Sequence, residues 1–279
     1  MRENPLLKAR KEHYAIGAFN VNTFDEMVAI ADAAAQVKLP VMLMASMSSA
    51  KFFTPSVFAD LVHTLDRSYP IDIIAHLDHC TDPELLLTCA REGFDSVMYD
   101  GSHTPYQDNV RVTGELAAQC HALGVLIEGE LGIIAGEEGP VKSKFSEFTD
   151  PDCAGDFIEK TGIDSLAVSI GNQHGFYKGE PKLQFELLEE LCRICTVPLV
   201  LHGGTGIPGG DIARAIRMGI CKVNVGTEIR AAYARGLLDY AEQHADDADV
   251  RKFVTYLRSR IQETAGRYME CFLGKEDIQ

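Results

Sequence analysis

Short apolar runs alternate with longer amphipathic segments along the whole chain. The apolar runs are rich in aliphatic and β-branched side chains, as expected for buried strands. They cover residues 16–20, 41–45, 73–77, 95–99, 125–130, 164–169, 198–202 and 220–225. Polar and apolar positions recur with helical spacing between them, as in 24–37, 82–91, 107–122, 183–194 and 209–218. This alternation predicts an α/β fold with parallel strands.

Helix start signals support this pattern. Thr23 precedes 24–37 with Glu26 three residues later, which resembles a capping box, and Thr81 or Asp82 precedes Pro83 in a first-turn position. Eight strand-then-helix units at a spacing of about 25–35 residues favour a (β/α)8 TIM barrel over a doubly wound sheet. The segment 249–272 predicts an additional C-terminal helix. We therefore expect a single TIM-barrel domain over residues 1–279.

Polar side chains stand at one end of all the predicted strands. Catalytic groups of TIM barrels lie at the C-terminal ends of the strands, so these side chains should converge on one site. They are Asn20, Asn22, Ser46, Asp78, His79, Asp100, Ser102, His103, Glu128, Glu130, His174, His202 and Asn224. Asp78 and His79 would face opposite ways on a regular strand. Both can reach the site only if the strand turns there.

Three of these residues, His79, His174 and His202, predict a metal site. Imidazole is a preferred ligand of zinc, and three protein ligands with an open fourth position are typical of catalytic zinc. A single histidine at a strand end is more often simply hydrogen-bonded, so the indication comes from all three together. His76 shares the facing of Asp78, and we interpret it as a support for the metal site.

Two glycine-containing segments follow the last two predicted strands, 202–206 (HGGTG) and 224–227 (NVGT). Glycines let backbone NH groups approach a ligand, and barrels often hold phosphate after strands seven and eight. The loop 131–150 is long for a structureless connection and contains Glu137 and Glu138. It predicts a functional lid, with Gly136 and Gly139 as hinges.

Composition limits the classes of partner. The chain has 279 residues, is 46% hydrophobic and carries a formal net charge of −15. That charge argues against binding to nucleic acid or to an anionic membrane surface. No apolar stretch reaches the roughly 20 residues of a membrane span, and the start lacks a signal-peptide pattern. With eight scattered cysteines, we expect a cytoplasmic protein with free thiols.

Taken in order, these segments resemble the class II, metal-dependent ketose-bisphosphate aldolases, the family of fructose- and tagatose-bisphosphate aldolases. The segments that carry the resemblance are GAFNVN (17–22), PVMLMAS (40–46), HLDHC (76–80), GFDSVMYDGSH (93–103), EGELGIIAGEE (128–138), DSLAVSIGNQHG (164–175), LVLHGGTG (199–206) and KVNVGTE (222–228). The resemblance covers nearly the whole chain in order.

The resemblance implies a zinc-dependent, reversible retro-aldol cleavage of a ketose 1-phosphate or ketose 1,6-bisphosphate to dihydroxyacetone phosphate and an aldehyde. Asp78 would be the acid/base, Zn²⁺ the electron sink, Asn224 a donor to the enediolate and Glu138 the lid carboxylate that moves the dihydroxyacetone phosphate proton. Glu130 would lie at or near the metal. The expected substrate-binding residues are Asn20, Ser46, Gly175, Gly203, Gly204, Thr205, Asn224, Val225, Gly226 and Thr227.

The resemblance further implies one Zn²⁺ per subunit, held by His79, His174 and His202. It implies a monovalent cation, Na⁺ or K⁺, near the phosphate, and a homodimer or homotetramer. The sequence departs from the family pattern at the distal phosphate, because the expected arginine falls on Thr255 or Tyr256. Gly226 also replaces an aspartate of the fructose-type enzymes. We therefore hypothesise a ketose 1-phosphate substrate whose other end carries no phosphate.

Other functions remain open at this point. Lys222 lies on the last predicted strand with the facing of Asn224 and would allow a Schiff-base aldolase. A metal-dependent sugar-phosphate epimerase would use a similar site. A non-catalytic phosphosugar-binding barrel is the third alternative.

Overall fold

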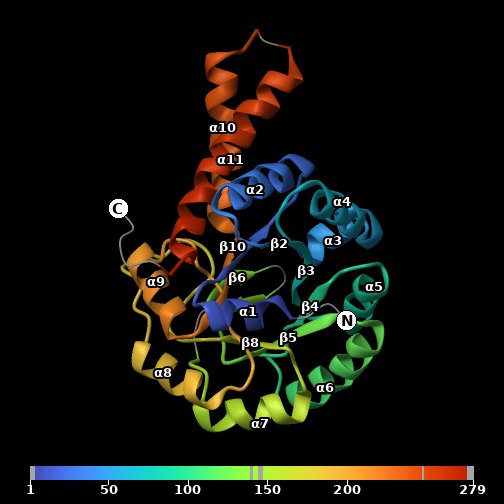
Figure 1. Cartoon of the computed structure of the whole chain (residues 1–279), viewed down its shortest axis with the longest axis vertical. Coiled ribbons are helices and arrows are strands. Elements are labelled where there is room, and N and C mark those ends of the chain that lie inside the picture. Colours follow the sequence, from blue (N-terminus) through green and yellow to red (C-terminus); the bar gives the residue numbers. More distant parts are fainter. Residues whose placement is uncertain (1–3, 139–140, 144–146, 247, 275–279) are drawn as a thin grey trace.

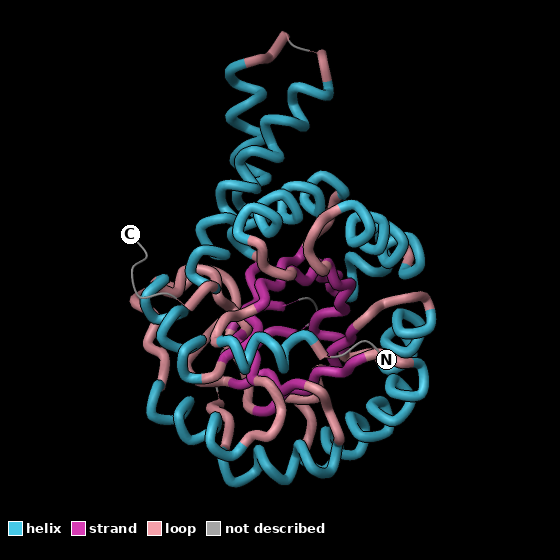
Figure 2. Tube along the Cα trace, viewed as in Figure 1, coloured by secondary structure: helices cyan, strands magenta, loops and turns pink. Residues whose placement is uncertain are grey.

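The computed structural model describes residues 4–138, 141–143, 147–246 and 248–274. Within these ranges, eight parallel strands close into a barrel in the order β1-β10-β9-β8-β5-β4-β3-β2 (Figures 1 and 2). The strands are β1 (Ile16–Asn20), β2 (Val41–Ser46), β3 (Ile73–Cys80), β4 (Ser96–Tyr99), β5 (Leu126–Leu131), β8 (Ser165–Val168), β9 (Leu199–Leu201) and β10 (Ile220–Val225). All the predicted strands are confirmed to within a few residues, and so is the TIM-barrel fold.

Most of the helices surround the barrel on the outside (Figure 1). The described helices are α1 (Pro5–Glu12), α2 (Phe24–Val37), α3 (Met47–Phe53), α4 (Pro55–Ser68), α5 (Pro83–Arg91), α6 (Tyr106–Leu123), α7 (Pro151–Thr161), α8 (Phe185–Ile194), α9 (Gly209–Met218), α10 (Thr227–Gln243) and α11 (Val250–Phe272). The predicted capping box is present at the start of α2, where Thr23 and Glu26 satisfy each other's backbone NH groups. Asp82 caps α5, with Pro83 in its first turn.

The barrel interior is apolar at the N-terminal ends of the strands, here called its lower end. Ile16, Met42 and Ile74 point inward there with their strand neighbours and form a cluster with Leu6 and Ala9 of α1. Helix α1 therefore closes the N-terminal end of the barrel, where it lies across the strands in Figure 1. The outward-facing side chains pack under the surrounding helices in a second, larger cluster. With the N-terminal end closed by α1, the pocket among the described residues lies at the C-terminal end.

Helices α10 and α11 project from the barrel as an antiparallel pair (Figure 1). The predicted C-terminal helix is confirmed as α11, which also packs along α2. Phe272 near its end meets Phe19 of β1 with ring centroids 6.2 Å apart, so the helix is anchored to the barrel wall. Among the described residues, no helix is long and apolar enough to cross a membrane.

The long loop after β5 contains structure that the sequence did not indicate. Its residues form a two-stranded antiparallel sheet from β6 (Gly136–Glu138) and β7 (Val141–Ser143). The base of this hairpin is held at Ala135, whose carbonyl accepts a hydrogen bond from the NH of His174 at 2.8 Å. Gly136 has a φ of 115°, and a Cβ there would lie 2.5 Å from the His174 carbonyl oxygen. The other predicted hinge, Gly139, lies outside the described residues.

Candidate active site

The end of β3 turns at His79. Its φ of 44° lies in the left-handed region, which is uncommon for a residue with a side chain. The register between β3 and β4 shifts between Leu77 and Cys80, so β3 contains an additional residue there. This bulge breaks the alternation of facing, and the side chains of Asp78 and His79 both line the small pocket at the barrel mouth. The predicted turn is confirmed.

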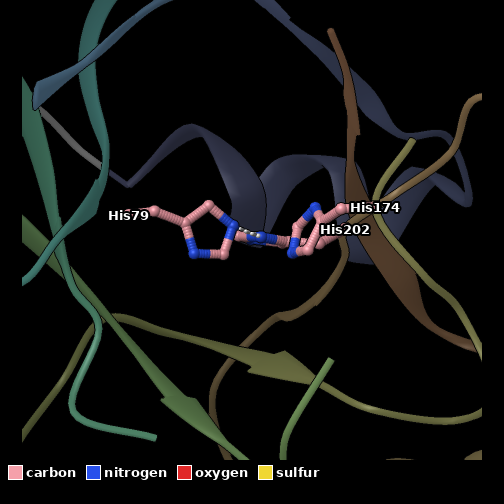
Figure 3. A group of neighbouring side chains, drawn as sticks. All are labelled: His79, His174 and His202. Atoms are coloured by element: carbon pink, nitrogen blue, oxygen red, sulfur yellow. Dashed lines mark hydrogen bonds between the residues drawn. The ribbon is translucent and has the colours of Figure 1, made fainter. Parts of the chain in front are cut away.

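The three candidate metal histidines meet at this pocket (Figure 3). His79 Nε2 lies 2.6 Å from His202 Nδ1, and the ring of His174 lies edge-on to His79 with centroids 4.7 Å apart. One nitrogen from each of the three rings falls within 4.8 Å of the others. A second such group combines His79 with Asp100 and Glu130. Residues from four different strands and loops therefore converge on His79.

Hydrogen bonds on the far side of two rings determine which nitrogens face the centre. Asp100 Oδ2 lies 3.0 Å from His79 Nδ1, and Glu128 Oε1 lies 2.9 Å from His202 Nε2. An ionised carboxylate only accepts, so each of these nitrogens carries the proton. The two facing nitrogens, 2.6 Å apart, are then both acceptors. Two inward lone pairs can share a proton at this distance or bind a metal ion. Together with His174 they form a set of three imidazoles, which is a donor set that suits Zn²⁺.

Burial and charge shift the pKa values of the carboxylates around this centre. Burial alone would raise the pKa of Asp100 and of Glu128. The hydrogen bond from His79 outweighs it at Asp100, and the charge of Lys222 outweighs it at Glu128, so both pKa values fall well below the ordinary range. Burial, helped by the nearby charge of Asp100, raises the pKa of Glu130 well above the usual value. Glu130 Oε2 has no hydrogen-bond partner among the described residues.

Asp78 is held between two amides. Its Oδ2 accepts a hydrogen bond from Asn20 Nδ2 at 2.9 Å, and its Oδ1 accepts one from Asn224 Nδ2 at 3.0 Å. Burial would raise the pKa of Asp78, but the electrostatic influence of the neighbouring His79 and His202 outweighs it and lowers that pKa. The carboxylate is therefore ionised and oriented beside the histidines. The Oδ1 atom of Asn224 is buried without a hydrogen-bond partner in the described part of the chain.

The glycine segments form one wall of the same pocket. Gly175, Gly203, Thr205, Gly226 and Thr227 line it together with the polar residues above. Gly203 has a φ of 63°, and a Cβ there would collide with the Gln173 carbonyl. Thr227 is the first residue of α10, so the NH groups of a helix N-terminus face this wall. This combination of backbone and helix end is suited to an anion.

Two tyrosines outside the predicted set hold this wall in place. Tyr177 Oη accepts a hydrogen bond from the Gln173 NH at 2.9 Å and donates one to the Gly203 carbonyl at 3.3 Å. Tyr268 of α11 accepts from the Gly206 NH at 3.3 Å and donates to Glu228 in the first turn of α10. The hydroxyls therefore join the loops after β8 and β9 to the start of α10. Both tyrosines lie outside any local motif.

A family model described as "Fructose-bisphosphate aldolase class-II" matches residues 3–277. The chain belongs to the class II fructose-bisphosphate aldolase family. It is therefore an aldolase, a carbon–carbon lyase. The resemblance stated from the motifs is confirmed.

Named relatives support the same family. Fructose-bisphosphate aldolases of Staphylococcus epidermidis RP62A and Staphylococcus aureus Mu50 are each 38% identical over 264 residues, covering 93% of this chain and 92% of the relative. The solved YdjI aldolase from Escherichia coli K12 has a TM-score of 0.84 at 32% identity, covering 96% and 94% of the two chains. Fructose-bisphosphate aldolase from Campylobacter jejuni has a TM-score of 0.81 at 25% identity, covering 98% and 94%.

Some of the expected substrate residues of this aldolase line the pocket, and others do not. Asn20 and Asn224 join the pocket-lining glycines and threonines. Ser46 pairs in register with Asp78 at the rim and caps α3. The Gly204 NH donates to the Asn224 carbonyl at 2.9 Å, so it is not available to bind a ligand. The side chain of Val225 is fully buried in the core, so only its backbone can meet a ligand. The side chain of Glu138 lies outside the described part of the structure.

Lys222 argues against the Schiff-base alternative in this aldolase. Its Nζ is fully buried, 2.8 Å from Glu128 Oε2 and 3.2 Å from His76 Nε2. An amine must be unprotonated and reachable to attack a carbonyl. The ion pair with Glu128 occupies the amine, and the burial keeps substrate away. His76 contacts Lys222 and Ser96, so any support that it gives to the histidines passes through other residues.

Arg230, an exposed residue outside the predicted site residues, lies beside the anion wall. Its Nη2 donates a hydrogen bond to Thr227 Oγ1 at 3.2 Å, and its Nη1 lies 3.4 Å from the place where a Cβ on Gly226 would be. A side chain at position 226 would also collide with Asn20. The spacing of three residues from Thr227, which is one helical turn, is the signal that could have found Arg230.

Proposed function

We propose that this class II aldolase cleaves a ketose phosphate reversibly to dihydroxyacetone phosphate and an aldehyde, with a zinc ion bound at the histidines. The observation that supports the proposal best is the bulge at His79. It directs a base, Asp78, and a metal ligand, His79, into one pocket from adjacent positions of the chain. A base next to a Lewis acid is what retro-aldol chemistry requires.

The metal would be held by His79, His174 and His202, one ion per subunit. When bound, Zn²⁺ supplies a Lewis acid that draws electron density from the substrate carbonyl. Asp100 and Glu128 hold the proton on the outer nitrogens of His79 and His202, so that the inner nitrogens stay available as ligands. Glu130 Oε2 lies 3.7 Å from His79 Nδ1 and is a further carboxyl group close to these ligands.

Asp78 would take the proton from the C4 hydroxyl as the C3–C4 bond breaks, and return it in the condensation direction. Its ionised state and the two amide hydrogen bonds hold it ready for that step. Asn224 then offers its amide to the oxygen on which negative charge develops. Glu138 would bring the proton for the carbon of the dihydroxyacetone phosphate fragment from the hairpin whose base is fixed at His174.

The phosphate of dihydroxyacetone phosphate would lie against Gly175, Gly203, Thr205, Gly226 and Thr227. A helix N-terminus and backbone NH groups favour an anion there without a large cluster of basic side chains. This accounts for phosphate binding in a chain with a formal net charge of −15. A Na⁺ or K⁺ ion beside this phosphate remains part of the proposal.

For the distal end of the substrate we propose a group without phosphate. Thr255 and Tyr256 occupy the positions where an arginine was expected, and the nearest arginines of α11 have carboxylate partners. Arg258 Nε donates to Asp25 Oδ1 at 2.9 Å, and Arg260 Nη1 lies 3.2 Å from Glu263 Oε2. Both guanidinium groups are therefore already neutralised within this chain. The relatives named fructose-bisphosphate aldolase make a 1,6-bisphosphate the alternative.

One experiment tests these points together. The purified protein is assayed for cleavage of fructose and tagatose 1,6-bisphosphates and of ketose 1-phosphates, with Zn²⁺ and with a chelator. We expect activity that is lost with the chelator, and kcat/KM higher for a 1-phosphate. A strong preference for a bisphosphate would contradict the distal-end proposal, and full activity in chelator would contradict the zinc proposal. Binding of these sugars without any cleavage would favour the non-catalytic barrel.

We further propose a single domain that assembles as a homodimer or homotetramer in the cytoplasm. The projecting α10/α11 pair carries exposed apolar side chains, among them Leu237, Leu238 and Val250. Apolar side chains gathered on a projecting arm favour burial against another surface. Light scattering coupled to gel filtration tests the assembly, and a monomer at micromolar concentration would contradict it.

A further inference from the structure

A polar layer crosses the barrel interior directly beneath the pocket. It consists of His76 of β3, Glu128 of β5 and Lys222 of β10, all almost completely buried. Lys222 Nζ lies 2.8 Å from Glu128 Oε2 and 3.2 Å from His76 Nε2. Because strand side chains alternate, these three residues lie one inward position below Asp78, Glu130 and Asn224. The layer separates the pocket from the apolar lower interior.

Stability does not explain the ion pair in this layer. Removing two charges from water is costly, and apolar residues of similar size often replace a buried pair without loss of stability. The inward positions one level lower, Met42 and Ile74 among them, are apolar and well packed. An apolar layer at the level of Lys222 would complete that packing. The charges at this level therefore point to a role at the histidines above.

Glu128 connects the ion pair to the metal centre. Its Oε2 accepts from Lys222, while its Oε1 lies 2.9 Å from His202 Nε2. The same His202 nitrogen also lies 3.3 Å from Asn224 Nδ2, which is a donor. If Nε2 accepted from Asn224, the proton of a neutral imidazole would move to Nδ1. The Nδ1 atom, which faces His79, could then no longer bind a metal.

We propose that Glu128, held by Lys222, is a positioning residue that keeps the proton of His202 on Nε2 and thereby presents Nδ1 to the metal. This inference depends on the proposed zinc function. Lys222 restrains the carboxylate from below, so that Glu128 meets His202 as a fixed acceptor. The carboxylate cannot donate, and it therefore decides between the two tautomers that His202 could adopt beside Asn224.

The first test measures zinc affinity in two variants. Glu128→Gln removes the obligatory acceptor, and the double variant Glu128→Gln/Lys222→Met removes both charges and leaves no unpaired ammonium group. We expect the Kd for Zn²⁺, from competition with a chromogenic chelator, to rise about 10- to 100-fold in both. Ser96→Ala is the matched control, because Ser96 lies in the barrel interior and contacts His76 at 2.9 Å. It should bind zinc like the wild type.

The second test needs no variant of the layer. In the metal-free wild type labelled with ¹⁵N-histidine, NMR distinguishes the two neutral tautomers, and His202→Gln identifies the signal of His202. We expect the proton on Nε2. A proton on Nδ1, or zinc affinities of both layer variants within twofold of the wild type, would overturn the inference. Failure of the wild type to bind zinc would count against the proposed function, and the tautomer would still decide the role of Glu128.

Discussion

Replacing Asp78 by asparagine removes the proposed base with almost no change in side-chain size. The carboxylate accepts one amide hydrogen bond on each oxygen, at 2.9 Å from Asn20 and 3.0 Å from Asn224. Asparagine has a single carbonyl oxygen, so one of these buried amides loses its acceptor at a cost of about 1–3 kcal/mol. The chain should still fold. Loss of the proton transfer should slow cleavage about 10²- to 10⁴-fold, equivalent to about 2.7–5.5 kcal/mol.

Two assays on the Asp78→Asn variant separate its role from that of the metal. One measures cleavage of the best ketose phosphate, and the other measures exchange of the dihydroxyacetone phosphate C3 proton with D₂O by NMR. Asp78 serves the hydroxyl on the aldehyde side, so cleavage should collapse while proton exchange stays within about tenfold of the wild type. The control Asp32→Asn makes the same chemical change at a carboxylate that accepts from Tyr69 at 2.7 Å. An equal fall in cleavage and exchange would refute the assignment, because it would place the damage in the metal or phosphate site that both reactions share.

Three further predictions concern the pocket wall and the polar layer. Gly203→Ala must move a backbone carbonyl to fit its Cβ, so it should lower both the melting temperature and the affinity for dihydroxyacetone phosphate. The control Gly210→Ala places its Cβ in open space in α9 and should be neutral or slightly stabilising. Equal melting temperatures of the two variants in scanning calorimetry would contradict this prediction. Arg230→Met should raise the inhibition constant of inorganic phosphate about 10- to 100-fold, because the guanidinium that bonds Thr227 beside the anion wall could no longer donate to the phosphate. An unchanged constant, matching the control Arg235→Met, would rule out contact between Arg230 and the phosphate. Burial and the nearby charge of Lys222 lower the pKa of His76 to about 3, so the neutral ring contributes stability above the unfolded value of about 6.5 and loses it as pH falls toward 3. We therefore expect the free energy of unfolding, measured with urea from pH 6 to pH 4, to depend less steeply on pH in His76→Asn than in the wild type, by up to about 1.4 kcal/mol per pH unit. Equal slopes in the two proteins would disprove the pKa shift of His76.

Local pattern was sufficient for the elements of the barrel. The strands, the capping box at Thr23 and the helix α11 follow from periodicity and from side chains that act within one or two turns. Ordering these elements into a barrel also predicted which strand ends converge, and hence His79, His174 and His202. It did not predict that α1 closes the barrel, or that the loop after β5 contains a hairpin based at His174. Both depend on contacts between segments that are distant in the sequence.

The sequence by itself therefore determined the barrel, its open end and the kinds of side chain at that end, because each depends on alternation within single elements. Only the tertiary structure decided how those side chains work together. His79 and His202 are separated by 123 positions, yet their nitrogens face each other at 2.6 Å. Arg230 acquired a place beside Gly226, and Lys222 became the partner of Glu128. Closing the barrel fixes these distances, since strand register and the bulge at His79 set the height and direction of each inward side chain.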